Sequence, residues 1–175
     1  MKSPRPEKKR AVAQKAGKPT AQPAAAKPPK VAFPKKDQPP TPATFAARLP
    51  LALGKRFEMA RTFLLRQTNV REDVYFYGAK TGWALRYLVG DYPLCALLLH
   101  GDMPVGIVSL SAAAAAAVDW KALSPVGQLA RRNAHGSPSL LWLDVPLAGH
   151  GAADFKAILR AKLASMVPRE SPAEE

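Results

Sequence analysis

The composition of this chain changes near residue 44, and the change limits what each part can fold into. The first 44 residues hold ten of the 18 prolines and eleven of the 26 Lys and Arg residues, but only two acids. Proline removes backbone donors and favours extended chain, and a segment this poor in large apolar residues cannot bury a core. We therefore predict a disordered basic tail over 1–44, a globular domain over 45–167 and a short disordered tail over 168–175.

The globular part has enough residues for one hydrophobic core. About 120 residues bury roughly two-thirds of their unfolded surface, so neither a metal nor a disulfide is needed to stabilise them. Cys95 is the single cysteine. It excludes an intramolecular disulfide and fits a reducing compartment, so we expect a cytoplasmic protein.

An apolar stretch from Leu94 to Val118 has the length of a membrane span. His100-Gly101-Asp102 and Pro104 interrupt it, and a turn at mid-bilayer would leave backbone polar groups without partners. We therefore expect two buried strands joined by a tight turn, and no membrane partner.

The spacing of apolar residues predicts the order of helices and strands. A helix of about four turns starts near Pro50 and ends before Asn69, because apolar residues recur there at helical spacing. Four strands are expected at 73–77, 83–89, 92–99 and 103–110, followed by a short helix at 112–118. A further helix opens at Ser124-Pro125, a fifth strand covers 139–145, and a last helix ends at Pro168.

These elements predict an α+β fold in the order α-β-β-β-β-α-α-β-α. Connections of two to five residues between the first four strands force antiparallel neighbours. We therefore expect an antiparallel meander sheet of about five strands, with the helices packed mainly on one face.

The strand at 83–89 carries the candidate ligand site. Alternation places Trp83 and Tyr87 on one face and Arg86 on the other, at the open side of the sheet. With Lys80 in the preceding turn, these four residues are the candidates for binding an anion or stacking on a base. The favoured alternative is structural: Arg86 pairs with an acid such as Asp144, and the aromatic rings belong to the core.

Catalytic and metal-binding patterns are weak in this sequence. Cys95 and His100 form the nearest nucleophile–base pair, but alternation separates them, and a thiol among leucines is typically a buried apolar group. The three histidines lack a cysteine or carboxylate at ligand spacing. We predict no catalytic residue, metal or cofactor, and lean against an enzyme.

One hairpin carries a resemblance to a known family. The run Tyr77-Gly78-Ala79-Lys80-Thr81-Gly82-Trp83-Ala84-Leu85-Arg86-Tyr87 resembles the signature of the bacterial domain-of-unknown-function family numbered 3788. The resemblance covers roughly residues 49–165 and is carried mainly by Gly78, Lys80, Gly82, Trp83 and Arg86. It implies a leading helix, this hairpin, an apolar strand pair and a closing helix, and it leaves the activity open.

The basic tail predicts a partner of opposite charge. Solvated cations attract nucleic-acid phosphates through counterion release, and the tail has no element that reads bases, so such binding would be independent of sequence. The candidate residues are Lys8, Lys9, Arg10, Lys27, Lys30, Lys35 and Lys36. A solubilising linker is the equally weighted alternative.

The sequence therefore supports two functions from different classes. The preferred one is a non-catalytic binding or accessory module whose tail attaches to nucleic acid or another polyanion. The alternative is a domain that binds, or acts on, an anionic metabolite in a cleft between sheet and helices near Lys80, Arg86 and His100.

Overall fold

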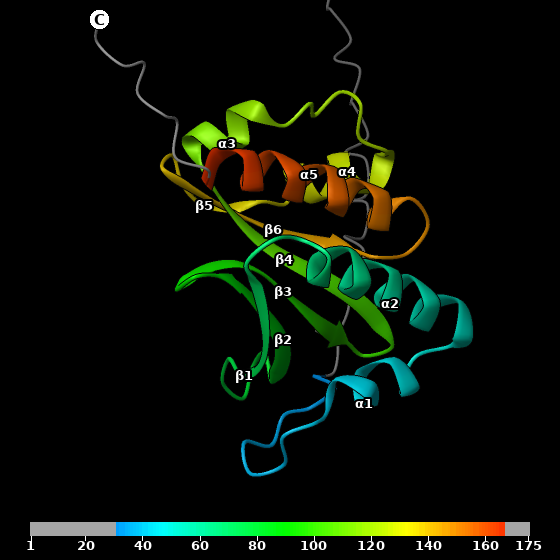
Figure 1. The fold of residues 1–175 in the computed structure, drawn as a ribbon. Helices are drawn as coiled ribbons and strands as arrows, with labels where there is room; N and C mark the ends of the chain where they lie inside the picture. Colours follow the sequence, from blue (N-terminus) through cyan, green and yellow to red (C-terminus); the bar gives the residue numbers. More distant parts are fainter. Residues whose placement is uncertain (1–30, 167–175) are drawn as a thin grey trace, which may run out of the picture.

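The computed structural model describes residues 31–166, and these form an α+β fold, as predicted (Figure 1). The predictions for residues 1–30 and 167–175 lie outside the described part. The elements are α1 (Pro42–Ala47), α2 (Leu51–Leu65), β1 (Val70–Phe76), β2 (Trp83–Val89), β3 (Tyr92–His100), β4 (Met103–Ser111), α3 (Ala112–Ala117), α4 (Pro125–Arg132), β5 (His135–Ser137), β6 (Leu140–Pro146) and α5 (Gly151–Met166).

The strands form one antiparallel sheet in the order β1-β2-β3-β4-β6-β5. The first four strands make the predicted meander, and β3 and β4 are the two strands expected in place of a membrane span. Figure 1 shows β1 and β2 turned steeply relative to β5 and β6, which is the twist expected of such a sheet.

The prediction of five strands was wrong, because the described residues contain six. The additional strand, β5, has three residues and pairs with β6 as a hairpin at the sheet edge. Its sequence, His-Gly-Ser, is typical of a turn, so no apolar alternation marked it. Helix α1 was missed as well, because prolines surround it.

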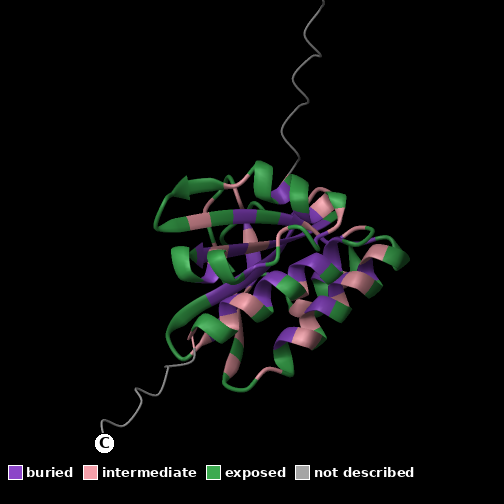
Figure 2. Cartoon of the chain, turned by 90° about the horizontal axis from the view of Figure 1, so that it is seen from above, coloured by how far each residue is buried: buried purple, intermediate pink, exposed green. Residues whose placement is uncertain are grey.

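All five described helices contribute to a core on one face of the sheet, here called the helix face. This agrees with the predicted packing on one side, and Figure 2 shows the buried residues gathered where the helices cover the strands. Strand residues that point into this core include Leu85, Leu97, Val108 and Leu143. Gly106 lets α5 approach β4, because a side chain there would overlap the ring of Phe155.

The opposite side of the sheet, here called the open face, has its own small apolar cluster. Its buried members are Ala84, Ala96, Leu98 and Val105, and Ile107 packs against them half-buried. No helix residue of the described chain takes part in this cluster. The open face is therefore the side of the sheet available for a ligand.

Part of the segment predicted to belong to the tail, residues 31–35, contacts the sheet instead. Val31 forms a β-bridge with His100, and the carbonyl of Phe33 accepts a hydrogen bond from Trp83 N at 3.1 Å. The Phe33 ring lies 4.8 Å from the ring of Phe45, which is fully buried. The predicted boundary was too late because proline and lysine content hid these few apolar anchors.

Gly82 is expected to be intolerant of a side chain. It has a φ of +79°, and a Cβ there would lie 2.5 Å from the Phe33 carbonyl oxygen and 2.6 Å from Val31 Cγ1. We expect Gly82→Ala to lower the free energy of unfolding by about 2 kcal/mol, through backbone strain and displacement of residues 31–33. Chemical denaturation of the purified variant measures this.

Gly78→Ala is the matched control for that measurement. Gly78 lies in the same turn with a φ of +94°, but no atom lies within 4 Å of a Cβ built on it. Its substitution should cost only the backbone strain, about 1 kcal/mol. Equal losses in the two variants would contradict the packing of residues 31–33 against the hairpin.

Candidate functional site

A groove of about 560 Å³ crosses the open face and is lined by residues from all six strands. Its floor is apolar, with Ala96 and Ile107 at the centre of the sheet. Side chains with polar or aromatic groups surround this floor. They are Tyr75, Tyr77, Thr81, Arg86, Cys95, His100, Ser109, His135, Trp142 and Asp144.

The strand register explains the width of the groove. Arg86, Ala96, Ile107 and Asp144 are cross-strand neighbours on β2, β3, β4 and β6. Three strand spacings separate the backbones of Arg86 and Asp144 by about 14 Å. Because only a methyl group and an isoleucine fill the middle of this row, the space between the two charged ends stays open.

One rim of the groove is held by an ion pair and aromatic rings. Arg86 donates to both carboxylate oxygens of Asp73, at 3.0 and 2.6 Å, and its guanidinium lies 3.8 Å from the centre of the Tyr75 ring. Tyr77 contacts Tyr75 edge-on at 4.9 Å between ring centres. The hydrogen bonds to Asp73 raise the pKa of Arg86. This rim is therefore fixed in place, and Arg86 is already partly neutralised.

The other rim is more exposed and less constrained. Trp142 on β6 is 39% exposed and is the cross-strand neighbour of His135 on β5. Asp144, also exposed, follows two residues later on the same side of β6. Tyr77 and Trp142 thus provide aromatic surface at opposite sides of an apolar floor.

A buried cation lies at the edge of the groove floor. Lys162 of α5 is 7% exposed, and its ammonium donates to the carbonyls of Pro93 (2.9 Å) and Leu94 (2.7 Å) and to Ser109 Oγ (3.3 Å). It reaches these groups where the β3–β4 ladder ends, beyond the pair of Ala96 and Ile107. All three acceptors belong to residues that line the groove, and they use all three ammonium hydrogens.

Burial of Lys162 lowers its pKa to about 8, although the neighbouring Cys95 opposes this. Between pH 8 and the ordinary value of 10.5, the unfolded chain therefore binds this proton and the folded chain does not. The free energy of unfolding should rise with pH across this window. From pH 8 to pH 10, the free energy of unfolding of the wild type should rise by about 2 kcal/mol relative to that of Lys162→Met. Urea denaturation at both pH values measures this difference. Parallel pH curves for the two proteins would contradict a buried Lys162.

The thiol of Cys95 is not arranged for nucleophilic chemistry. Cys95 is 6% exposed, and burial raises the pKa of its thiol. His100 is half-buried and also lines the groove, but no hydrogen bond within the described residues joins the two side chains. The arrangement favours binding over catalysis at this pair.

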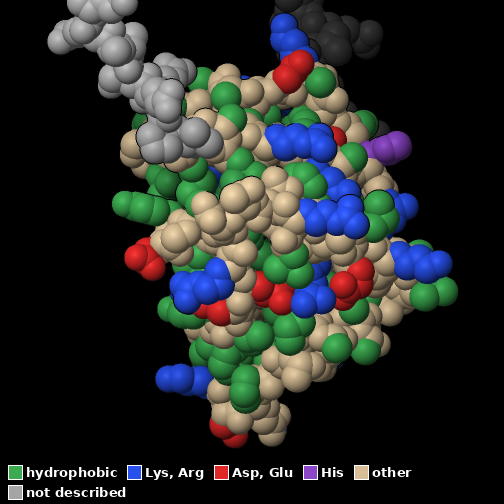
Figure 3. Space-filling view, in the orientation of Figure 1, with side chains coloured by type: hydrophobic (Ala, Val, Ile, Leu, Met, Phe, Trp, Pro, Cys, Tyr) green, Lys and Arg blue, Asp and Glu red, His purple; other side chains and the backbone are tan. Residues whose placement is uncertain are grey.

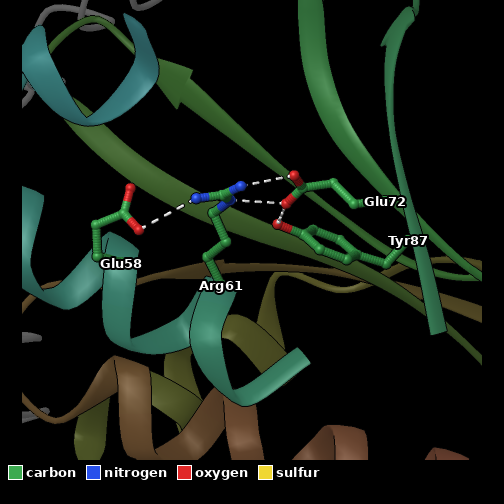
Figure 4. Close-up of polar contacts among 4 residues, drawn as sticks. All are labelled: Glu58, Arg61, Glu72 and Tyr87. Atoms are coloured by element: carbon green, nitrogen blue, oxygen red, sulfur yellow. Dashed lines mark hydrogen bonds and ion pairs between the residues drawn. The ribbon is translucent and has the colours of Figure 1, made fainter. Parts of the chain in front are cut away.

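A second polar network lies on the helix face and is structural (Figure 4). Arg61 of α2 donates to both carboxylate oxygens of Glu72, at 2.8 and 2.9 Å, and Tyr87 OH donates to Glu72 Oε2 at 2.7 Å. Burial alone would raise the pKa of Glu72, but the hydrogen bonds from Arg61 and Tyr87 outweigh it and lower the pKa. Glu72 and its neighbour Asp73 are therefore both held in ion pairs, on opposite faces of the sheet.

The four candidate ligand residues lie at different places in the fold. Arg86 lines the groove, paired with Asp73 rather than with Asp144. Tyr87 is fully buried on the helix face, and Trp83 lies on that face half-buried, with its indole donating to the Lys35 carbonyl at 2.8 Å. Lys80 is exposed in the turn and does not line the groove.

The tail residues proposed for polyanion binding fall into two groups. Lys35 and Lys36 are exposed, in the segment that packs beside the hairpin. The other five, Lys8, Lys9, Arg10, Lys27 and Lys30, lie outside the described residues.

Most groove residues were not found by reading the sequence. Alternation alone does place Ile107 and Ser109 on one face of β4, and Trp142 and Asp144 on one face of β6. What it cannot supply is the register that sets these pairs side by side, or the position on α5 from which Lys162 reaches them. For Lys162, the available signal in the sequence was a lysine within the apolar stripe of the last helix.

Within residues 31–166, no three His, Cys, Asp or Glu side chains gather as metal ligands would. None of the helices in that range combines the length and apolar character needed to cross a bilayer. Comparison with protein-family models, with curated proteins and with solved structures finds no match. Membership of family 3788 therefore stays a prediction carried by the hairpin residues.

Proposed function

We propose that this protein is a small-molecule-binding module whose open-face groove takes a ligand with a planar ring. The observation that carries the proposal is the groove itself: an apolar floor between Arg86 and Asp144, whose backbones are about 14 Å apart, with Tyr77 and Trp142 at its sides. Ligand sites are typically concave and apolar, with a few polar groups that fix orientation. This differs from the expected cleft between sheet and helices, because the helix face is filled by the core.

The polar groups of the groove support binding rather than turnover. Arg86 is held by Asp73, and the Cys95 thiol has a raised pKa. The remaining polar side chains, among them Thr81, His100 and His135, are distributed around the rim. Such a distribution suits hydrogen bonds to the edge of a ring that stacks between aromatic side chains.

A neutral fluorescent ring compound tests this proposal. N-phenyl-1-naphthylamine (NPN) should bind the full chain, and Trp142→Ala should weaken its binding about tenfold, because ring stacking contributes about 1–3 kcal/mol. Met59→Ala is the control, since Met59 is a 57% exposed hydrophobic residue of α2, away from the open face. Absence of NPN binding, or equal weakening by both substitutions, would refute a groove site.

A second function, attachment to nucleic acid or another polyanion through the N-terminal segment, is proposed from its charge. Eleven Lys and Arg residues against two acids in the first 44 positions give that segment a net charge of +9. Figure 3 shows Lys and Arg side chains of the described residues separated by hydrophobic and acidic ones, rather than joined in one patch. The segment, not the domain surface in that view, is the source of concentrated positive charge.

Matched charge substitutions in the full chain test the attachment. One variant changes Lys8, Lys9, Arg10, Lys27 and Lys30 to Gln; the control changes Lys55, Lys80, Lys121, Arg132 and Lys156 to Gln. Binding to a random-sequence DNA duplex, measured by anisotropy at about 50 and 200 mM salt, should weaken and lose salt dependence mainly in the first variant. Equal effects in both variants would refute attachment through this segment.

A further inference from the structure

We infer that the groove selects a negatively charged ligand, whose anionic group rests on the Ser109 hydroxyl in front of the buried Lys162 ammonium. The inference rests on the proposed groove function and adds the charge class of the ligand. The cation that selects the ligand is then Lys162, which reaches the groove from the helix face. It is neither Lys80 nor Arg86, the two candidates from the sequence.

The first support is that Lys162 lacks a counter-ion. Within residues 31–166, no carboxylate lies within 4 Å of its ammonium, and its partners are two carbonyls and one hydroxyl. A charge that is buried without a partner of opposite sign is costly, and an anion bound nearby would offset that cost. Arg86, in contrast, already has its anion in Asp73.

The second support is the direction in which this charge acts. Lys162 enters from α5, but its three acceptors all belong to groove-lining residues of β3 and β4. Ser109 Oγ accepts from Lys162, so its own hydroxyl hydrogen is free to donate. A hydroxyl polarised by an ammonium behind it is a strong donor to an anion.

The third support is the distribution of the other charges around the groove. Asp144 is exposed at the rim beside Ile107, so water screens its charge, whereas Lys162 is in a low-dielectric position. The cross-strand neighbour of Ser109 is Trp142, whereas Asp144 is the neighbour of Ile107, so a neutral aromatic residue and not the carboxylate is paired with Ser109. The anionic end of the ligand is therefore most favourably placed at Ser109, and its ring extends over Ile107.

Two dyes with the same ring system test the charge preference. 8-Anilinonaphthalene-1-sulfonate (ANS) equals NPN with one added sulfonate. Lys162→Met should weaken ANS binding about tenfold and change NPN binding less than about twofold, since a single unscreened charge at this range is worth about one order of magnitude. An unchanged ratio of ANS to NPN affinity would overturn the inference.

Lys156→Met is the matched control. Lys156 is on the same helix, but its ammonium lies over the ring of Phe63 at 5.7 Å, on the outer side of the helical layer. This variant loses the same charge from the whole protein and should keep the wild-type ratio of ANS to NPN affinity. A fall equal to that of Lys162→Met would show a general charge effect and would also overturn the inference.

A measurement on the unmutated full chain tests the preference for a negatively charged ligand even if Lys162→Met does not fold. Tenfold coupling between the sulfonate and the ammonium must raise the pKa of Lys162 by about one unit when ANS is bound. NMR titration of the Lys162 side chain in the presence of ANS or NPN should show this rise with ANS alone. If NPN binding depends on Trp142 but the pKa of Lys162 is unchanged by ANS, the groove binds a ring compound without a preference for negative charge. That result would refute the present inference and leave the proposed groove function supported.

Discussion

Replacing Phe45 with alanine is expected to lower the free energy of unfolding by about 4 kcal/mol, as a fully buried phenylalanine typically does. Phe45 is 0% exposed and lies between the rings of Phe33 at 4.8 Å and Phe57 at 6.1 Å. It joins the N-terminal segment to α2, so its loss should affect the whole cooperative unit. Urea denaturation, followed by far-UV circular dichroism, measures the change.

Leu51→Ala is the control for Phe45, because Leu51 is 76% exposed at the start of α2. It should change the free energy of unfolding by less than about 0.5 kcal/mol. If Phe45→Ala behaves like this control, residues 31–49 are not part of the folding unit, and the folded domain begins only at α2.

Replacing Asp154 with alanine is expected to cost about 3 kcal/mol, which is large for a single polar residue. Asp154 is 6% exposed in the first turn of α5, and its carboxylate accepts from the backbone N–H groups of Ser124 and Gly127, both at 3.0 Å. It also accepts from the Ser124 hydroxyl. Its removal takes this acceptor from the N–H groups of Ser124, the N-cap of α4, and of Gly127, which is buried. Thermal and urea denaturation of the variant check this.

Two further variants test whether the lost stability comes from the hydrogen bonds that Asp154 accepts. Asp154→Asn keeps one acceptor oxygen and should recover part of the lost stability. Asp144→Ala removes an exposed carboxylate that makes no hydrogen bond within the described residues, so it should leave stability within about 0.5 kcal/mol. A loss from Asp154→Ala no larger than that of Asp144→Ala would refute the bridge between α5 and α4.

The elements that sequence patterns predicted well are those with strong local signals. The alternation Trp83–Val89 gave the bounds of β2, and the Ser124-Pro125 pair marked the start of α4, where Ser124 caps the helix. β1 begins three residues earlier than predicted, at Val70, because charged residues near its start hid the alternation. Glu72 is tolerated there because Arg61, eleven residues earlier in the chain, pairs with it and Tyr87 donates a hydrogen bond to it.

The candidate site was only partly predictable for a related reason. Alternation correctly sent Arg86 to the open face, opposite Tyr87. The groove, however, depends on cross-strand neighbours such as Ile107 and Asp144, which are 37 positions apart, and on a lysine from the last helix. Such long-range juxtapositions follow from strand order and register, which local spacing does not encode.

The open-face groove as the binding site is the central claim, and a shift map by NMR tests it most directly. In the full-length protein titrated with NPN, the largest backbone amide shifts should fall on Ala96, Ile107 and Trp142, while α2 and the outer side of α5 stay unchanged. Shifts confined to the helical layer, or none at all, would contradict the claim.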